Sequence, residues 1–237
     1  MRKLSVVVLA LLAYSASFSQ TTPKKTIITR ASDHFMIQIA ANSWQGAADS
    51  VSSYIKGFNR SANAYIMFDK PFKSNPKMSA AIGIGVGTSN IYFNKMVVNI
   101  TSAKSPLPFV RTDTGSHYKK YKLEEAFLEI PVEFRFMAHP ENPNKSIKAA
   151  VGFKLGTLLN AHTKGRGLVS ASGTKLNDFT VKESSKTFFN TTRLAATARV
   201  GYGIFSIFGS YSVTGVFKTG VAPDTKLMQV GLTISGL

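Results

Sequence analysis

Charged side chains recur at alternate positions within otherwise apolar segments of this sequence, and they are the residues best placed to do chemistry. The six are Glu129, Glu133, Arg135, Lys154, Arg193 and Arg199. Charges on the inward face of a sheet must pair or be hydrated, because an isolated charge is costly away from water. The set predicts an interior network of ion pairs, with a conductive or proton-linked path as the alternative.

The histidines, by contrast, do not suggest a metal site. They are His34, His117, His139 and His162. They lie far apart in the sequence and show no metal-ligand spacing such as the HExxH pattern. We therefore expect neither a metal site nor a cofactor.

The stretch that must position most of these charges is Lys122–His162, which contains two alternating arms. In the first arm the even positions from Ala126 to Phe136 are apolar, while the odd positions carry three of the charged residues. A period of two indicates a β-strand. The second arm alternates likewise, and the intervening HPENPNK is turn chemistry. The stretch is therefore a predicted hairpin, and each arm exceeds the roughly 9–11 residues that a tilted strand needs to cross a bilayer.

Six further segments show the same alternation. They are His34–Trp44, Arg60–Phe68, Met78–Thr88, Thr192–Tyr202, Phe205–Phe217 and Lys226–Ser235. With the hairpin they make eight strands, joined alternately by short turns and longer loops, which is the pattern of bacterial outer-membrane barrels. The sequence thus predicts an all-β fold, an eight-stranded antiparallel up-and-down transmembrane β-barrel.

Two long polar stretches, Asn90–Lys120 and Thr163–Asn190, are predicted extracellular loops. Aromatic residues gather near the predicted strand ends, where they are expected to form two interfacial girdles. On the turn side these are Phe134, Phe136, Tyr202 and Phe205, and on the loop side Trp44, Tyr92, Phe93 and Phe217.

The register of the central hairpin decides which charges meet. If the turn aligns Phe136 with Ile147, Glu129 lies opposite Lys154, and we expect the two to be coupled. Eight strands leave room inside a barrel only for side chains, so the lumen is expected to be closed. Pro131 lacks an amide donor, which allows a bulge at that position.

Length and composition favour one domain that is exported. The 237 residues show no interdomain linker, and residues 1–19 have the basic start, apolar core and small residues of a signal peptide. A polar lead-in at 20–32 and a barrel domain at 33–237 follow. The sequence contains no cysteine, so stability must come from backbone pairing or a large core rather than from disulfides.

The net charge of +17 has two interpretations. The basic residues are scattered through predicted loops rather than interleaved with aromatics on one segment, so we expect no nucleic-acid partner. Lipopolysaccharide presents phosphate at the outer leaflet, where Lys and Arg can bind it. The residues expected to face it are Lys119, Lys120, Lys164 and Arg166. The alternative is that the charge only keeps the loops solvated.

The run LEIPVEFRF, a proline-bearing turn and the glycine-rich AAVGFKLGTLL together resemble the PorT-like family of bacterial outer-membrane β-barrels. The likeness extends over about residues 35–237, and its most specific piece is Leu128-Glu129-Ile130-Pro131. The resemblance implies a location in the outer membrane and, for some members, a part in protein secretion or gliding machinery.

Three classes of function remain open. The first, which we favour, is a non-enzymatic outer-membrane barrel that serves as a structural, surface or secretion-accessory component. The second is a lipid-A-modifying barrel enzyme, but no nucleophile, base and orienting group stand at fixed spacing. The third is a soluble lipocalin-like periplasmic binder, which places its apolar face inside. The small residues and charges of the second face fit a narrow lumen better.

Overall fold

The computed structural model describes residues 35–235. The expected signal peptide at 1–19 and lead-in at 20–32, together with His34, lie outside these residues. Two short helical segments, α2 (Asp49–Ser52) and η1 (Pro143–Lys145), lie between strands. The strands are β1 (Phe35–Gln45), β2 (Asn59–Pro71), β3 (Met78–Phe93), β4 (Met96–Val98), β5 (Phe109–Arg111), β6 (His117–Met137), β7 (Ile147–Val169), β8 (Lys175–Ser184), β9 (Thr192–Tyr202), β10 (Phe205–Ser212) and β11 (Lys226–Ser235).

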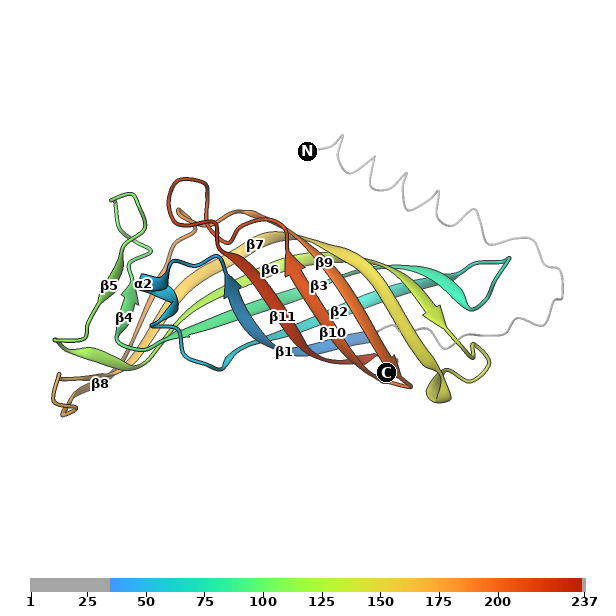
Figure 1. Cartoon of the computed structure of the whole chain (residues 1–237), viewed down its shortest axis with the longest axis horizontal. Helices are drawn as coiled ribbons and strands as arrows, with labels where there is room; N and C mark the ends of the chain where they lie inside the picture. The colour runs from blue at the N-terminus through green and yellow to red at the C-terminus, as the bar shows by residue number, and fades with distance from the viewer. Residues whose placement is uncertain (1–34, 236–237) are drawn as a thin grey trace, which may run out of the picture.

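Eight of these strands close into an antiparallel barrel within the described part of the chain. They are bonded in the order β6-β3-β2-β1-β11-β10-β9-β7, and a further pairing of β6 with β7 completes the circle. Neighbours in the barrel are neighbours in the order of these eight strands, which is an up-and-down topology. Figure 1 shows the strongly inclined strands and the protruding loop end. The predicted fold class is confirmed.

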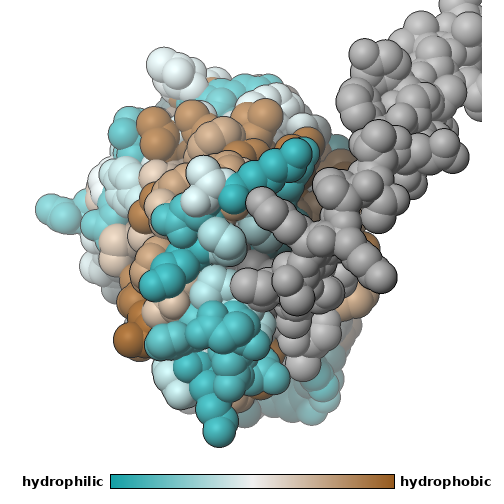
Figure 2. Space-filling model, turned by 90° about the vertical axis from the view of Figure 1, so that its right-hand side faces the viewer, coloured by the Kyte–Doolittle hydropathy of each residue, from teal (hydrophilic) through white to brown (hydrophobic). Residues whose placement is uncertain are grey.

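The barrel wall alternates as the sequence predicted, with apolar side chains outside. On β1, Ile37 and Ile39 are exposed, whereas Gln38 and Ala40, which alternate with them, are buried. A soluble protein would place its large apolar residues inside, so an exposed apolar wall around a polar interior is the arrangement of a membrane barrel. Seen from the turn end, hydrophobic residues form the wall around a hydrophilic end (Figure 2). No helix within 35–235 is long and apolar enough to span a membrane.

The loop end contains more strand than predicted. Strands β6 and β7 have 21 and 23 residues and continue past the barrel, where β8 pairs with β7 and the hairpin β4–β5 forms a small second sheet. The predicted loops at 90–120 and 163–190 therefore both contain strands as well as turns and irregular segments. In contrast, β10 ends at Ser212 rather than at Phe217, because the chain turns inward there and buries Val216 and Phe217.

The predicted register of the central hairpin is wrong by two residues. Phe136 pairs with Ala149 rather than with Ile147, and Glu129 lies opposite Gly156 rather than Lys154. Pairing continues two residues further toward the turn, where the amide of Ala138 donates to the carbonyl of Ile147 at 3.0 Å. A shift of two leaves every side chain on its predicted face.

A bulge does occur in the hairpin, but not at the proline. The pairing of β6 with β7 shifts between Ala126 and Phe127, whereas Pro131 is in regular register opposite Lys154. The extra residue of β7 lies at the level where the strands leave the barrel and form the loop-side sheet. Bulges commonly mark such a change in twist and direction.

Candidate functional site

The first charged cluster in the lumen is centred on Glu129, whose side chain is almost fully buried. Its carboxylate accepts hydrogen bonds from the hydroxyl of Tyr65 and from Nη2 of Arg193, and Lys154 Nζ lies 3.7 Å from Oε2. These partners come from β2, β9 and β7, so the cluster spans the lumen. A Cβ at Gly87 on β3 would lie 2.4 Å from Glu129 Oε2, so any larger residue there would have to displace the carboxylate from this position.

The second cluster lies closer to the turn end and is centred on Glu133. Arg199 Nη2 donates to Glu133 Oε2 at 3.1 Å, and Arg135 Nε donates to the same oxygen at 2.8 Å. Arg135 Nη1 also lies 3.7 Å from Asp69, which accepts a hydrogen bond from Ser79. The six charged residues expected on the inner face thus lie within two clusters.

Sequence reasoning missed two members of these clusters, Tyr65 and Asp69. Both lie on β2 with the inward parity of Asn63 and Met67. The alternation predicts a strand that ends at Phe68, so it assigns Asp69 to the turn. Period-two counting extended one residue further would have placed Asp69 inside, whereas nothing in the spacing distinguishes Tyr65 from a packing aromatic.

Neutral polar side chains fill the opposite side of the lumen. Gln38 donates to Thr233 at 3.1 Å and Asn63 donates to Gln38 at 3.3 Å, while Asn42 is bonded to Ser89 and Gln229 at 3.3 Å each. Amides have both donors and acceptors, so they satisfy one another without a net charge. The barrel interior is therefore mostly polar, with a small apolar cluster of Met36, Tyr65, Met67 and Ala81, and many of its polar side chains are bonded to one another.

Above this polar interior lies an apolar cap, defined by the buried cluster around Trp44. The indole packs edge-on against Phe93 and Phe217, with ring centroids 5.8 and 5.5 Å apart, and Phe189 packs on Phe217 at 5.4 Å. Leu107 and other side chains of the loop-side segments complete the cluster. Segments from several loops thus fold over the mouth of the barrel.

This cap corrects the expected loop-side girdle. Trp44, Phe93 and Phe217 are buried in the cap rather than at the lipid interface. The parity of Trp44 on β1 and of Phe93 on β3 directs these two into the barrel mouth, whereas Phe217 lies after β10, where the chain turns inward. Tyr92, which points the other way, is half-buried on the outer face. At the turn end Phe134, Phe136, Tyr202 and Phe205 are exposed on the outer wall, where a girdle was expected.

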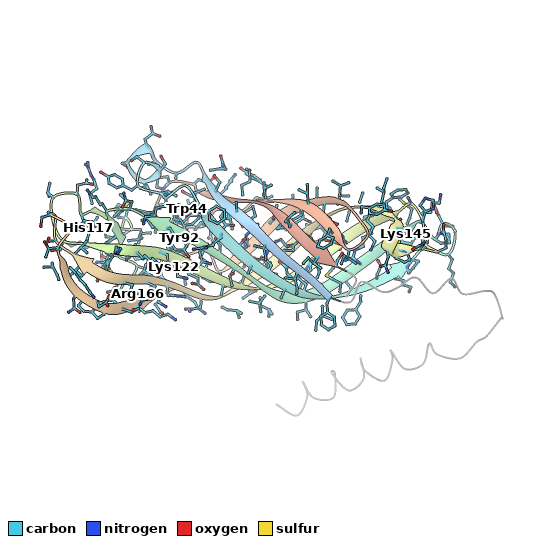
Figure 3. All side chains as sticks on the ribbon, turned by 90° about the horizontal axis from the view of Figure 1, so that it is seen from below. Trp44, Tyr92, His117, Lys122, Lys145 and Arg166 are labelled. Carbon is cyan, nitrogen blue, oxygen red and sulfur yellow. The ribbon has the colours of Figure 1, made fainter. Side chains whose placement is uncertain are left out.

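Basic side chains gather on the outer face of the loop-side sheet. Lys120, Lys164 and Arg166 line one groove of about 460 Å³ together with Lys56, Phe58, Arg60, Tyr92, Tyr121 and Lys122. Lys119, the fourth residue expected to face lipopolysaccharide, lines adjoining hollows with Gly167 and Asp178. Figure 3 shows Tyr92, Lys122 and Arg166 in this part of the molecule, away from Lys145 at the turn end.

The described histidines lie apart from one another. His162 Nε2 is 3.6 Å from Glu124, His139 Nδ1 is 3.1 Å from Glu141, and His117 contacts the carbonyl of Gly115. Within residues 35–235 no group of three or more His, Cys, Asp or Glu side chains is arranged to hold a metal ion.

Comparison with known protein families gives a match over most of the chain. The model of the family described as outer membrane protein beta-barrel domain matches residues 18–221, which is most of the chain. No curated protein matches the sequence significantly. The closed barrel, its exposed apolar wall and this match agree, and they place the protein in the outer membrane. The chain belongs to the outer membrane protein beta-barrel domain family.

Proposed function

We propose that this protein is a non-enzymatic outer-membrane barrel with a lumen closed to ions, which serves as a structural, surface or secretion-accessory component. The observation that carries the proposal is the burial of the lumen charges. Glu129, Arg135 and Lys154 are only 1%, 2% and 4% exposed. Charges that line a water-filled pore are solvated, whereas these are in contact with one another.

Two independent closures support the absence of a pore. Across the barrel, the clusters of Glu129 and Glu133 join β6 to β7 and β9 by ion pairs. At the loop end, the cap of Trp44 and Phe217 covers the mouth with apolar side chains. An ion that crossed the barrel would have to break the ion pairs of the lumen and lose its hydration water to pass the apolar cap. Both steps are costly.

Basic residues on the loop side support lipopolysaccharide as a partner of this protein. The basic residues Lys119, Lys120, Lys164 and Arg166 lie beyond the apolar wall on the loop side, where the outer leaflet presents phosphate. We include in the proposal that these loops rest on lipopolysaccharide, since charge-assisted hydrogen bonds to phosphate are among the stronger polar contacts.

The PorT-like part of the proposal rests on the motif Leu128-Glu129-Ile130-Pro131. Leu128 and Ile130 are exposed on the lipid side, whereas Glu129 is the centre of the first lumen cluster. The motif therefore combines two membrane-facing residues with Glu129, which contacts Tyr65, Lys154 and Arg193. On this basis we extend the proposal to a part in secretion or gliding machinery, as the PorT-like resemblance implies.

The test is reconstitution into planar bilayers after cell fractionation. The proposal expects the protein in the outer membrane, with heat-modifiable gel mobility, and bilayers that stay silent after insertion. Large, stable single-channel currents would overturn the closed lumen. Hydrolysis or transfer of an acyl chain or phosphate on lipid A incubated with the purified protein would overturn the non-enzymatic role.

A further inference from the structure

The groove on the outer face is built by adjacent strands in fixed register. Tyr92 on β3 pairs with Lys122 on β6, and Lys122 pairs with Lys164 on β7. One step further toward the loop end, Lys120 pairs with Arg166. Four cationic side chains therefore occupy neighbouring positions on a rigid sheet, rather than on separate mobile loops.

The charge within this groove is incompletely neutralised by the protein. Lys122 Nζ bonds to Glu124 and to Asn90, and Glu124 also faces His162. In contrast, Lys120, Lys164 and Arg166 are exposed and form no ion pair with any acid of residues 35–235. Three cations held close together repel one another, so an anion placed between them is favoured.

The level of the groove matches that of a lipid headgroup. On β6, Leu128 of the apolar wall lies six residues from Lys122, and on β7, Leu159 lies five residues from Lys164. At about 3.4 Å per residue and a strand tilt of about 40°, each cation stands roughly 13–16 Å above its apolar neighbour along the membrane normal. Acyl chains beside Leu128 and Leu159 would thus leave their headgroup near the groove.

Aromatic side chains at the groove favour a lipid over a free anion. Phe58 is 67% exposed, and the guanidinium of Arg60 lies 5.8 Å from its ring and 5.3 Å from the ring of Tyr92. Stacking on both rings keeps the guanidinium close to the groove. A large exposed ring next to cations is the amphipathic arrangement found at the bilayer interface. Inorganic phosphate would make no apolar contact with such a ring.

We propose that this groove is a discrete site for one phosphoryl group of an outer-leaflet glycolipid. The phosphate lies between Lys120, Lys164 and Arg166, while the acyl chains follow the apolar wall of β6 and β7. This inference rests on the proposed function, in which the loop side contacts lipopolysaccharide. It assigns that contact to one phosphate bound in one groove.

The experiment compares two triple variants of the full-length protein purified from outer membranes. The groove variant is K120Q/K164Q/R166Q, and the matched control K104Q/K186Q/K218Q removes three exposed loop lysines that do not line the groove. Both lower the charge equally. Binding of bisphosphorylated lipid A to the protein in neutral detergent is measured by native mass spectrometry at low salt. We expect about tenfold weaker binding for the groove variant and less than about twofold for the control.

Two further measurements distinguish a lipid phosphate from free inorganic phosphate as the bound anion. Lipid A stripped of its phosphates should bind the wild type about tenfold more weakly, and millimolar inorganic phosphate should not displace intact lipid A. Equal losses in the two triple variants, binding independent of the lipid phosphates, or displacement by inorganic phosphate would each overturn the site. Heat-modifiable gel mobility verifies that each variant folds, and R60Q is a milder variant if the triple one does not.

Failure of the site is distinguishable from failure of the proposed function. If wild type and both variants bind lipid A equally, the discrete groove is wrong while the lipopolysaccharide contact stands. If the wild type binds no lipid A, that contact is wrong as well. The closed lumen is measured separately by bilayer recordings, which the groove substitutions should leave silent.

Discussion

Side chains fill the barrel at two levels by opposite means. In the membrane-spanning part, Glu129 and Glu133 hold buried cations across the lumen. At the loop end, Trp44, Phe93 and Phe217 close the mouth by apolar packing. Arg193 joins the two regions, because it pairs with Glu129 while its guanidinium lies 3.8 Å from the ring centroid of Phe127, a residue of the cap.

The difference between these regions lies in how specific each closure must be. Buried charges require particular partners at particular distances, since one unpaired charge costs more than the pair contributes. Apolar packing is non-directional, and it tolerates substitution as long as volume is kept. The charged region therefore depends on strand register, whereas the cap depends on loops that are free to adjust. The two regions should respond differently to mutation.

The largest effect is expected for Glu129→Ala. The substitution leaves Lys154 and Arg193 buried without their carboxylate, which should cost about 3–5 kcal/mol of unfolding free energy. Denaturant unfolding, followed by Trp44 fluorescence and heat-modifiable gel mobility, measures it. The control is Glu124→Gln, because Glu124 is only half-buried and its loss should cost less than about 1 kcal/mol. Equal costs would mean that the lumen is hydrated.

The next effect concerns the cap, where Phe217→Ala removes a ring that contacts Trp44 and Phe189. The cavity should cost about 3 kcal/mol of local stability. Because the barrel strands are held mainly by their own backbone pairing, we expect faster proteolysis of the loop-side segments and unchanged gel mobility of the barrel. The matched control is Phe205→Ala on the outer wall, which should leave loop proteolysis unchanged. Unfolding of the whole barrel by Phe217→Ala would remove the distinction between the regions.

Double-mutant cycles compare the coupling within each region. For Glu129 and Lys154, whose charged atoms are 3.7 Å apart, we expect a coupling energy of about 1–3 kcal/mol. Removing Lys154 as well should relieve the uncompensated cation in the Glu129 variant. For Trp44 and Phe217 the coupling should be smaller, about 0.5–1.5 kcal/mol. Zero coupling for the first pair would contradict the observed diagonal contact across β6 and β7.

Much of the charged region was predictable from sequence, because a period of two assigns each side chain to one face of a strand. It placed Glu133 and Arg199 on the inner side without knowledge of their partners. The partners themselves depend on register, and the predicted register was displaced by two residues. Glu129 and Lys154 are nevertheless close, since long side chains reach a diagonal neighbour on the same face.

The cap was not predictable, for a physical reason. Phe189 and Phe217 lie in irregular segments, where no periodicity assigns a direction to a side chain. Trp44 and Phe93 do lie on strands, and the alternation assigns both to the inner face, but it does not show that loops fold over the mouth and pack against them. Only the path of the loops over the mouth decides between these, and that path depends on contacts far apart in the sequence. Exposed groove cations, by contrast, were found from charge alone.

The smallest effect concerns a pair of hydrogen bonds beside the cap, which we call the polar tie. Both are accepted by Asp113, which follows β5. The hydroxyl of Tyr54 donates to Asp113 Oδ2 at 2.7 Å, and Arg111 Nε donates to it at 3.0 Å. The bond from Tyr54, followed by that from Arg111, lowers the pKa of Asp113 below its ordinary 3.8. A lowered carboxylate pKa stabilises the fold above the ordinary value, and this contribution disappears as the pH falls through the lowered one.

The tie should thus be intact at neutral pH and loosen only below about pH 4, without any change between about pH 5 and 8. A carbon-13 titration of labelled aspartate measures it. In Tyr54→Phe the pKa of Asp113 should rise toward 3.8. Asp178 is the internal control, because the bond from Lys175 lowers its pKa and should remain. An Asp113 pKa at or above 3.8 in the wild type would contradict the polar tie. Apolar packing would then be the main interaction that stabilises this part of the cap.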